Sequence, residues 1–255
     1  MKQSMPVLRE PAVKRRGNRR LKMVLLLLFI VVLSVLFFNS SISEVSTVTV
    51  AGQRFVNEDS IRKLSGISIG DAFFGFTERS VERKLRTSKS IEQATVTKVF
   101  PGEVRIRVQE FAAVGYELSP EGEIMAILSN GTSVPATNAD FVVDKPLLSG
   151  WKKDDPIKTA LSKQLALIPA QQLSDLSEIR PDPSNAYPDR IRIYTRTRFE
   201  VITAVSVLAT KLDTLNAVTE TQQPGRVTML LADTYEPYLP DSAENMETLE
   251  KESTQ

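Results

Sequence analysis

The sequence predicts an α+β protein with a single transmembrane helix near its N-terminus. Three observations predict it: an uncharged apolar run over residues 23–38, a following stretch in the order β-α-α-β-β, and a longer stretch of short strand patterns with two helical patterns among them. The last stretch is expected to form a β-rich domain with a mixed sheet. The predicted boundaries are 1–22 for a basic cytoplasmic tail, 23–41 for the transmembrane helix, 45–112 for the first domain, 113–240 for the second domain and 241–255 for an acidic, disordered tail.

The apolar run is interpreted as a membrane anchor. A helix rises about 1.5 Å per residue, so a hydrocarbon core of about 30 Å takes roughly 20 residues. The run is slightly shorter than that, and Leu21 and Ile42 can extend it. Lys and Arg collect on the cytoplasmic side of a span, so everything after Phe38 is predicted to lie outside the cell. The basic residues that flank the anchor are Arg15, Arg16, Arg19, Arg20 and Lys22.

A cleavable signal peptide is the nearest alternative to an anchor. Its apolar core has about 7–15 residues and is followed by a small-x-small cleavage site. The run here is longer, and only Ser41-Ile42-Ser43 imitates such a site weakly. The prediction is therefore an uncleaved anchor and a single-pass protein of the cell membrane.

Charge is distributed unevenly along the chain. The chain has 32 Lys and Arg residues and 31 Asp and Glu residues. Residues 1–22 hold eight of the basic residues and one of the acidic residues, so the rest of the chain has a net charge of −6. An acidic domain is a poor nucleic-acid binder, and the basic tail beside an apolar span is better explained by topology and by contact with anionic membrane lipids. The chain has no Cys and no His, which removes thiol chemistry, Ser-His nucleophile pairs and zinc sites. No cofactor and no metal are expected.

The first domain is expected to contain strands over 45–50, 91–100 and 103–110, with two helices between the first two strands. Asn57 and Thr77 predict the helix starts, because both side chains can cap a helix N-terminus. Gly66 is expected to end the first helix. Pro101-Gly102 joins the last two strands as an antiparallel hairpin. The strand over 103–110 alternates apolar and polar residues, which predicts one buried and one wet face.

The second domain is expected to contain short strands and two helices. Glu121-Gly122 and Asn130-Gly131 predict tight turns between strands. Pro156 suits the start of a helix, because its missing N–H is not needed there. The expected strands cover 114–118, 124–128, 177–179, 190–195, 199–202 and 227–231, with a further one at Val134, and the expected helices cover 157–168 and 208–218.

Three segments together resemble the POTRA domain of the FtsQ/DivIB family of bacterial cell-division proteins. They are V-x-V-x-G within 48–56, G-x-x-hydrophobic-F within 67–74, and F-P followed by alternating apolar residues and Glu110 within 91–110. The sequence departs from the family at Ser90, where Pro is frequent, and at Phe111-Ala112, which replaces a basic-x-Pro step. Weaker matches carry the resemblance over roughly residues 20–240; they are P-x-L-x-G at 146–150, Lys211-Leu212 and Asp233.

The resemblance implies a function without chemistry. A member of this family would be a non-enzymatic, bitopic scaffold of the divisome, concentrated at the division septum. It would bind coiled-coil subunits of the FtsL and FtsB/DivIC type and help to regulate septal peptidoglycan synthesis. No small-molecule substrate and no nucleic acid are implied.

Two surfaces are candidates for partner binding. The strand over 227–231 comes near the chain end and is predicted to lie at a sheet edge, where unpaired N–H and C=O groups can accept a partner strand. The alternative is that this strand and the tail pack on their own domain. The wet face of the strand over 103–110 offers Arg105 and Arg107 to lipid head groups or to a partner. The candidate partner-binding residues near the chain end are Val227, Met229, Leu230, Leu231, Tyr235 and Tyr238.

A membrane-anchored cell-wall enzyme is the alternative function. Ser60 with Lys63 and Ser149 with Lys152 fit S-x-x-K, the nucleophile pattern of penicillin-binding enzymes. The sequence has no K-T-G and no S-D-N to accompany either serine. A third class is an external sensor whose residues 1–20 bind a cytoplasmic protein. The prediction remains a scaffold and not an enzyme.

Overall fold

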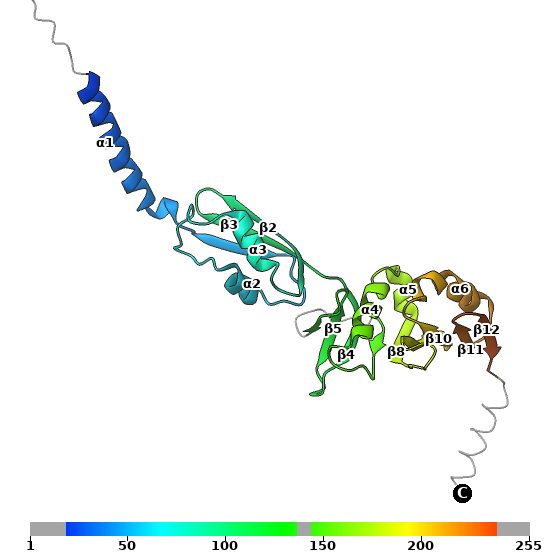
Figure 1. Ribbon diagram of the computed structural model, residues 1–255. Coiled ribbons are helices and arrows are strands. Elements are labelled where there is room, and N and C mark those ends of the chain that lie inside the picture. Colours follow the sequence, from blue (N-terminus) through cyan, green and yellow to red (C-terminus); the bar gives the residue numbers. More distant parts are fainter. Residues whose placement is uncertain (1–18, 137–143, 239–255) are drawn as a thin grey trace, which may run out of the picture.

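The computed structural model describes residues 19–136 and 144–238 of the chain. Figure 1 shows a long helix, a small domain and a larger domain following one another along the molecule. The fold is α+β, with one N-terminal apolar helix followed by a small and a β-rich domain, as the sequence predicts. Arg15, Arg16 and the acidic tail over 241–255 lie outside the described residues.

The N-terminal helix α1, Arg19–Phe38, is 20 residues long and apolar enough to cross a membrane by length and composition. Arg19, Arg20 and Lys22 lie exposed in its first turn and just beyond it. A short 3-10 helix, η1 (Ser41–Ser43), follows. The hydroxyl of Ser43 donates to the carbonyl of Phe38 at 2.8 Å, so the chain turns tightly as it leaves α1.

The first domain is a three-stranded sheet with two helices. In the strand order β1-β3-β2, β1 runs parallel to β3, and β2 is antiparallel to β3. The core between the sheet and the helices includes Ile61, Val81 and Ile106. The elements are β1 (Thr47–Ala51), α2 (Glu58–Ser65), α3 (Glu78–Leu85), β2 (Ile91–Val99) and β3 (Glu103–Glu110).

The predicted helix caps of this domain are confirmed. The Asn57 side chain accepts the N–H of Asp59 at 2.8 Å at the start of α2. Thr77 caps α3 in the same way. Gly66 ends α2 in the left-handed conformation, with φ of 68°. β3 has the predicted bounds and alternates between buried and exposed side chains.

The second domain is a nine-stranded mixed sheet in the order β12-β11-β10-β9-β8-β7-β4-β5-β6. β10 and β11 are parallel, as are β7 with β4 and β7 with β8, and the other neighbours are antiparallel. The strands are β4 (Ala113–Leu118), β5 (Ile124–Leu128), β6 (Ser133–Pro135), β7 (Leu147–Leu148), β8 (Leu176–Pro181), β9 (Arg190–Thr195), β10 (Glu200–Ala204), β11 (Gly225–Met229) and β12 (Asp233–Pro237).

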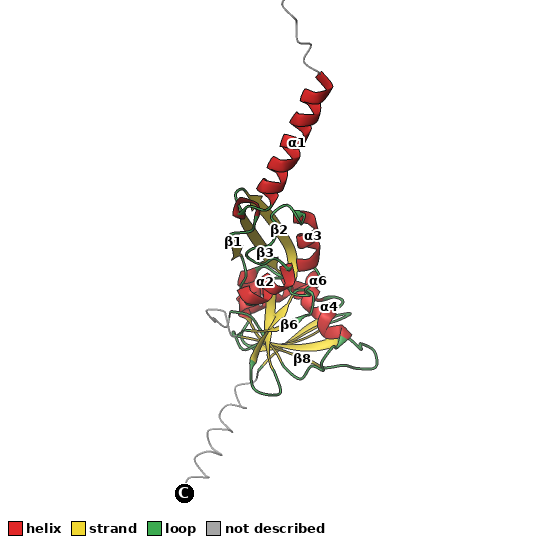
Figure 2. Cartoon of the chain, turned by 90° about the vertical axis from the view of Figure 1, so that its left-hand side faces the viewer, coloured by secondary structure: helices red, strands yellow, loops and turns green. Residues whose placement is uncertain are grey.

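Three helices pack on this sheet: α4 (Pro156–Leu165), α5 (Ala170–Asp175) and α6 (Leu208–Thr221). α4 and α6 lie on the same side of the strands in both views (Figure 1, Figure 2). The sequence predicts only α4 and α6, and the additional α5 is a six-residue helix that buries Leu173. The core between sheet and helices includes a row of apolar side chains in register across four strands: Ile179, Ile193, Val201 and Val227. Leu208, Leu212 and Leu215 of α6 belong to the same core.

Candidate interaction surfaces

The prediction that residues 227–231 form the last strand and an open sheet edge is wrong. That segment is β11, which ends at Met229 and pairs with β10 on one side and β12 on the other. A further strand, β12, pairs antiparallel to β11 and ends the sheet. The chain can fold back because residues 230–232 form a bend that reverses its direction. Within residues 19–136 and 144–238, no strand lies beyond β12.

The outer edge of β12 has backbone groups that face away from β11. The N–H of Tyr238 donates to the carbonyl of Pro224 at 3.2 Å. Antiparallel pairs alternate between bonded and non-bonded residues, so Thr234 and Glu236 also bond toward β11. The N–H and C=O of Tyr235 then point to the open side. Pro237, which has no N–H, also falls at an outward position, where proline is tolerated in an edge strand.

Side chains hold β12 against its own domain. Lys211 of α6 donates to both carboxylate oxygens of Asp233, at 2.8 and 2.9 Å. The hydroxyl of Tyr235 donates to the carbonyl of Gln223 at 2.7 Å. These contacts explain why Lys211 and Asp233 occur together in the sequence pattern. Asp233 begins β12 and does not end the preceding strand.

The predicted partner-binding residues fall into different environments. Val227 and Met229 are buried, with 2% and 0% of their surface exposed, and face the core under α6. Leu230 and Tyr235 are half-buried. Leu231 is 93% exposed and Tyr238 is 49% exposed. A partner can therefore touch Leu231, Tyr235 and Tyr238 directly, and the role of all six residues in binding stays a prediction.

A ladder of charges lies on the sheet face opposite the helices. Glu200 is on this face, because the adjacent Val201 belongs to the helix-side core. Its nearly buried carboxylate pairs with Arg192 and, at 2.9 Å, with Arg226. Asp182 extends the ladder by pairing with Arg192 at 3.3 Å. The sequence of these strands shows only that apolar and polar residues alternate. Which charged residues lie side by side depends on the register of the strands, which the sequence does not give.

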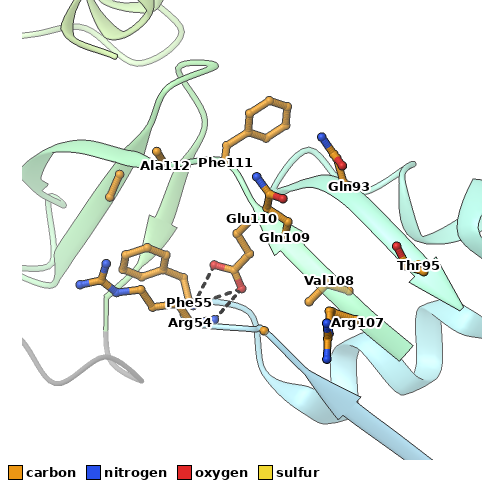
Figure 3. Close-up of a pocket in the computed structure, with 12 residues that line it drawn as sticks. Arg54, Phe55, Gln93, Thr95, Arg107, Val108, Gln109, Glu110, Phe111 and Ala112 are labelled. Atoms are coloured by element: carbon orange, nitrogen blue, oxygen red, sulfur yellow. Dashed lines mark hydrogen bonds between the residues drawn. The ribbon is translucent and has the colours of Figure 1, made fainter. Parts of the chain in front are cut away.

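The two predicted first-domain surface residues are both exposed on β3. Arg105 pairs with Glu103 at 2.6 Å, and hydrogen bonding from this guanidinium lowers the pKa of the Glu103 carboxyl. Arg107 lines a hollow of about 460 Å³ beside the junction between the domains (Figure 3). Their contact with lipid or with a partner stays a prediction.

The junction between the domains is built on Glu110, the last residue of β3. Its carboxylate accepts the backbone N–H groups of Arg54 and Phe55, both at 2.9 Å (Figure 3). It also accepts the N–H of Val56 at 3.0 Å. This arrangement fixes the loop after β1 and directs Phe55 into the second domain. Phe55 is 6% exposed and packs with a cluster on β4, β5 and β6 that includes Tyr116 and Leu128.

A second contact couples the domains. The side-chain amide of Asn130 donates to the carbonyl of Lys89 at 2.7 Å, while its oxygen accepts the N–H of Thr132 at 3.0 Å. The turn predicted at Asn130-Gly131 therefore also reaches the first domain. Sequence reasoning missed the junction, because Glu110 and Phe55 are 55 residues apart and form no local pattern.

The serines of the enzyme alternative do not form a nucleophilic site. The hydroxyl of Ser149 donates to Glu178 and accepts from Arg180 at 3.1 Å, which places it in a polar ladder. Lys152 is exposed. Ser60 and Lys63 are exposed on α2. Among the described residues, the hydrogen bonds and ion pairs join neither serine to its lysine.

A known family model agrees with the architecture of the first domain. The family model described as POTRA domain, FtsQ-type, matches residues 43–111. A solved structure, the major extracytoplasmic domain of the trans isomer of the cell division protein DivIB from Geobacillus stearothermophilus, is 29% identical, with a TM-score of 0.38, and the match covers 43% of this chain and 92% of that chain. The apolar helix and the FtsQ-type domain define the class: a single-pass membrane protein with a POTRA domain.

Curated relatives make the assignment specific. The cell division protein DivIB of Paenibacillus polymyxa is 47% identical over 98% of both chains. DivIB of Geobacillus kaustophilus is 31% identical over 91% of this chain and 90% of its own. DivIB of Bacillus subtilis is 28% identical over 80% of this chain and 77% of its own. The chain belongs to the DivIB family of cell division proteins.

Proposed function

We propose that this chain is a non-enzymatic scaffold of the divisome that binds coiled-coil subunits of the FtsL and FtsB/DivIC type through the outer edge of β12. Binding would hold these subunits at the division septum and so help to regulate septal peptidoglycan synthesis. The basic residues before α1 support a cytoplasmic N-terminus, with both domains outside.

The observation that carries the proposal is the exposed edge of β12. Four of its five residues are exposed, and its outer N–H and C=O groups are available to an added strand. The exposed Leu231 precedes this edge strand and supplies apolar contact. Strand addition takes affinity from main-chain hydrogen bonds and specificity from such flanking side chains.

The test compares two variants of Tyr235 in the full chain held in nanodiscs. Tyr235→Pro removes the outward N–H, whereas Tyr235→Ala removes the same aromatic ring but keeps the N–H. If a partner strand bonds to this edge, the proline variant binds the coiled-coil partner about tenfold more weakly than the alanine variant, as expected for one lost hydrogen bond.

Two results would count against the proposal. Equal binding by Tyr235→Pro and Tyr235→Ala would mean that this N–H is not used by the partner. Failure of the wild-type chain to capture any coiled-coil subunit would remove the scaffold interpretation itself. Circular dichroism and melting temperature of each variant establish that the domain remains folded. Leu231→Lys, a change at a fully exposed flanking side chain, tests the apolar contact separately.

A further inference from the structure

Aromatic side chains gather where α1 meets the first domain. The rings of Phe37 and Phe38, at the end of α1, lie 6.1 and 6.0 Å from the ring of Phe74. Phe74 in turn lies 6.5 Å from Phe100, and both contact Phe73. We call these five residues the membrane-end cluster. Phe74 and Phe100 come from two separate loops of the first domain, so the domain itself contributes to the cluster.

Backbone hydrogen bonds fix the first domain to the end of α1. Phe73 donates its N–H to the carbonyl of Ser43 at 2.8 Å. Val45 donates to Asp71 and accepts from Gly70, both at 2.8 Å. The segment between α1 and β1 is therefore part of the domain and not a free tether. Because the loop over 70–74 is fixed in this way, Phe74 stays beside the last turn of the membrane helix.

The cluster exposes apolar surface at this end of the domain. Phe74 is 52% exposed and Phe100 is 54% exposed. Ile42 of η1 and Ile69, which precedes Gly70, are 52% and 68% exposed. Exposed apolar side chains gathered at one end of a domain mark a contact with a membrane or with a partner. Its position at the end of a membrane helix favours the membrane.

The length of the apolar helix supports the same assignment. The uncharged run over 23–38 has 16 residues, which corresponds to about 24 Å, whereas a hydrocarbon core is about 30 Å thick. A short span thins the bilayer locally or draws its flanking residues inward. Arg19, Arg20 and Lys22 at the N-terminal end of α1 are charged and oppose entry into the hydrocarbon core. The missing apolar length is therefore expected at the Phe38 end of the helix. Interfacial side chains reach about 5–10 Å into the bilayer, which matches the missing length.

A cation lies beside this group of rings, with the Lys98 ammonium 5.7 Å from the ring centre of the exposed Phe74. The ammonium of Lys98 is 4.7 Å from the ring centre of Phe73 and 4.5 Å from that of Phe76. It also donates to the carbonyl of Phe76 at 3.0 Å. A positive charge beside apolar side chains suits the phosphate layer above the hydrocarbon boundary.

We propose that Ile42, Ile69, Phe74 and Phe100 insert into the leaflet next to the first domain, at the boundary between head groups and hydrocarbon. The first domain then has two membrane contacts, α1 and this apolar end. Two contacts restrict its tilt, so the domain holds the second domain and β12 at a set height above the bilayer. The lipid surface is the partner, and the assignment does not depend on what β12 binds.

Nitroxide labelling of the full chain in lipid nanodiscs tests this proposal. The chain has no Cys, so each single-cysteine variant carries one label. The test positions are Phe74→Cys and Phe100→Cys. Leu118→Cys is the matched control, because Leu118 is 61% exposed but belongs to the second domain, beyond the first domain from α1 (Figure 1). Leu28→Cys, in the middle of α1, reports the bilayer interior. Collision rates with oxygen and with a water-soluble nickel chelate measure the depth of each label.

The proposal predicts an oxygen-to-nickel accessibility ratio at Phe74 and Phe100 several-fold above that at Leu118 and below that at Leu28. Ratios at Phe74 and Phe100 equal to the Leu118 value, with a high ratio at Leu28, would overturn it, because α1 would then span the bilayer while the apolar end stays in water. The double variant Phe74→Ser with Phe100→Ser adds a second readout: a label at Leu118 is expected to show broader angular motion relative to the bilayer.

Discussion

At the scale of single residues, Glu110 organises the junction between the two domains. One carboxylate accepts three backbone N–H groups from the loop that carries Phe55 into the second domain. A carboxylate accepts several such bonds because it has two oxygens and no donor, whereas an amide has one oxygen and adds donors. The identity of this residue, and not only its polarity, therefore sets the junction.

Glu110→Gln is expected to lower the free energy of unfolding by about 1.5–3 kcal/mol, the usual value for losing hydrogen bonds to a charged group. Urea denaturation of the full chain in nanodiscs, followed by the fluorescence of Trp151, measures the change. Glu121→Gln, at an exposed turn of the second domain, is the control and should leave the midpoint unchanged. A Glu110 variant as stable as this control would contradict the role given to the carboxylate.

Glu178 gives a prediction for pH. Burial raises the pKa of its carboxyl, but hydrogen bonds from Ser149 and Arg180 outweigh burial, so the pKa lies below its usual value of 4.5. A carboxyl with a lowered pKa in the folded state stabilises the fold above its usual pKa, and this contribution is lost as the pH falls through the lowered value.

The stability of the second domain should therefore fall as the pH decreases below about 4.5, and Glu178→Gln should reduce the slope of this fall. Asp144 and Asp189 also have lowered pKa values and add to the slope in wild type. The melting temperatures of wild type and of Glu178→Gln, each measured between pH 7 and pH 3, test this prediction. Identical pH profiles for wild type and Glu178→Gln would refute the assignment.

At the scale of elements, β12 depends on Gly225 of the neighbouring strand. A Cβ atom built at Gly225 would lie 2.3 Å from the carbonyl oxygen of Glu236 and 2.9 Å from Cα of Pro237. Both are backbone atoms of β12, which cannot move aside without leaving the sheet. Gly225 thus allows β11 and β12 to approach each other closely at the end of the hairpin that they form.

Gly225→Ala should separate the end of β12 from β11 and weaken binding of the coiled-coil partner at least as much as Tyr235→Pro. The core should remain, because the three atoms nearest to an added Cβ all belong to β12 and not to the helices. Hydrogen exchange is the measurement: faster exchange is expected in β12 and unchanged exchange in β9 and β10. Thr234→Ala, at an exposed side chain of β12 that adds no atom toward β11, is the control and should leave exchange in β12 unchanged.

The elements that local sequence predicts and those that it misses differ in a physical way. β3, α2 and the start of α3 follow from alternation and capping residues, which act within a few positions. β12 contains Asp233, Glu236 and Pro237, residue types that are depleted in strands. It becomes a strand only because β11 offers an edge to pair with, which no local pattern in this segment reveals. α5 is too short for a helical period to stand out.

At the scale of the whole molecule, the contacts form a connected series from membrane to edge strand. The segment that follows α1 is hydrogen-bonded to the first domain through Ser43 and Val45, and the first domain is joined to the second through Phe55 and Asn130. The second sheet then continues to β12 at its far end. Only the anchor and the order of the domains could be predicted from the sequence; both junctions depend on contacts between distant residues.

Phe55→Ala should loosen the junction between the domains. Removing a buried ring leaves a cavity at the contact and costs about 3–5 kcal/mol where the site cannot collapse. Spin labels at Thr97→Cys and Asp213→Cys, one in each domain, should show a broader distance distribution in this variant. Leu118→Ala, at an exposed side chain, should leave the distribution as narrow as in wild type. A distribution in Phe55→Ala as narrow as in wild type would contradict the role given to the Phe55 ring.

Pairing of a partner strand with the outer edge of β12 can be measured by amide hydrogen exchange of the full chain in nanodiscs, with and without the coiled-coil partner. The N–H of Tyr235, which faces the open side, is expected to exchange at least about tenfold more slowly in the complex, as one new hydrogen bond requires. Unchanged exchange at Tyr235, together with new protection elsewhere on the second domain, would contradict strand pairing at this edge.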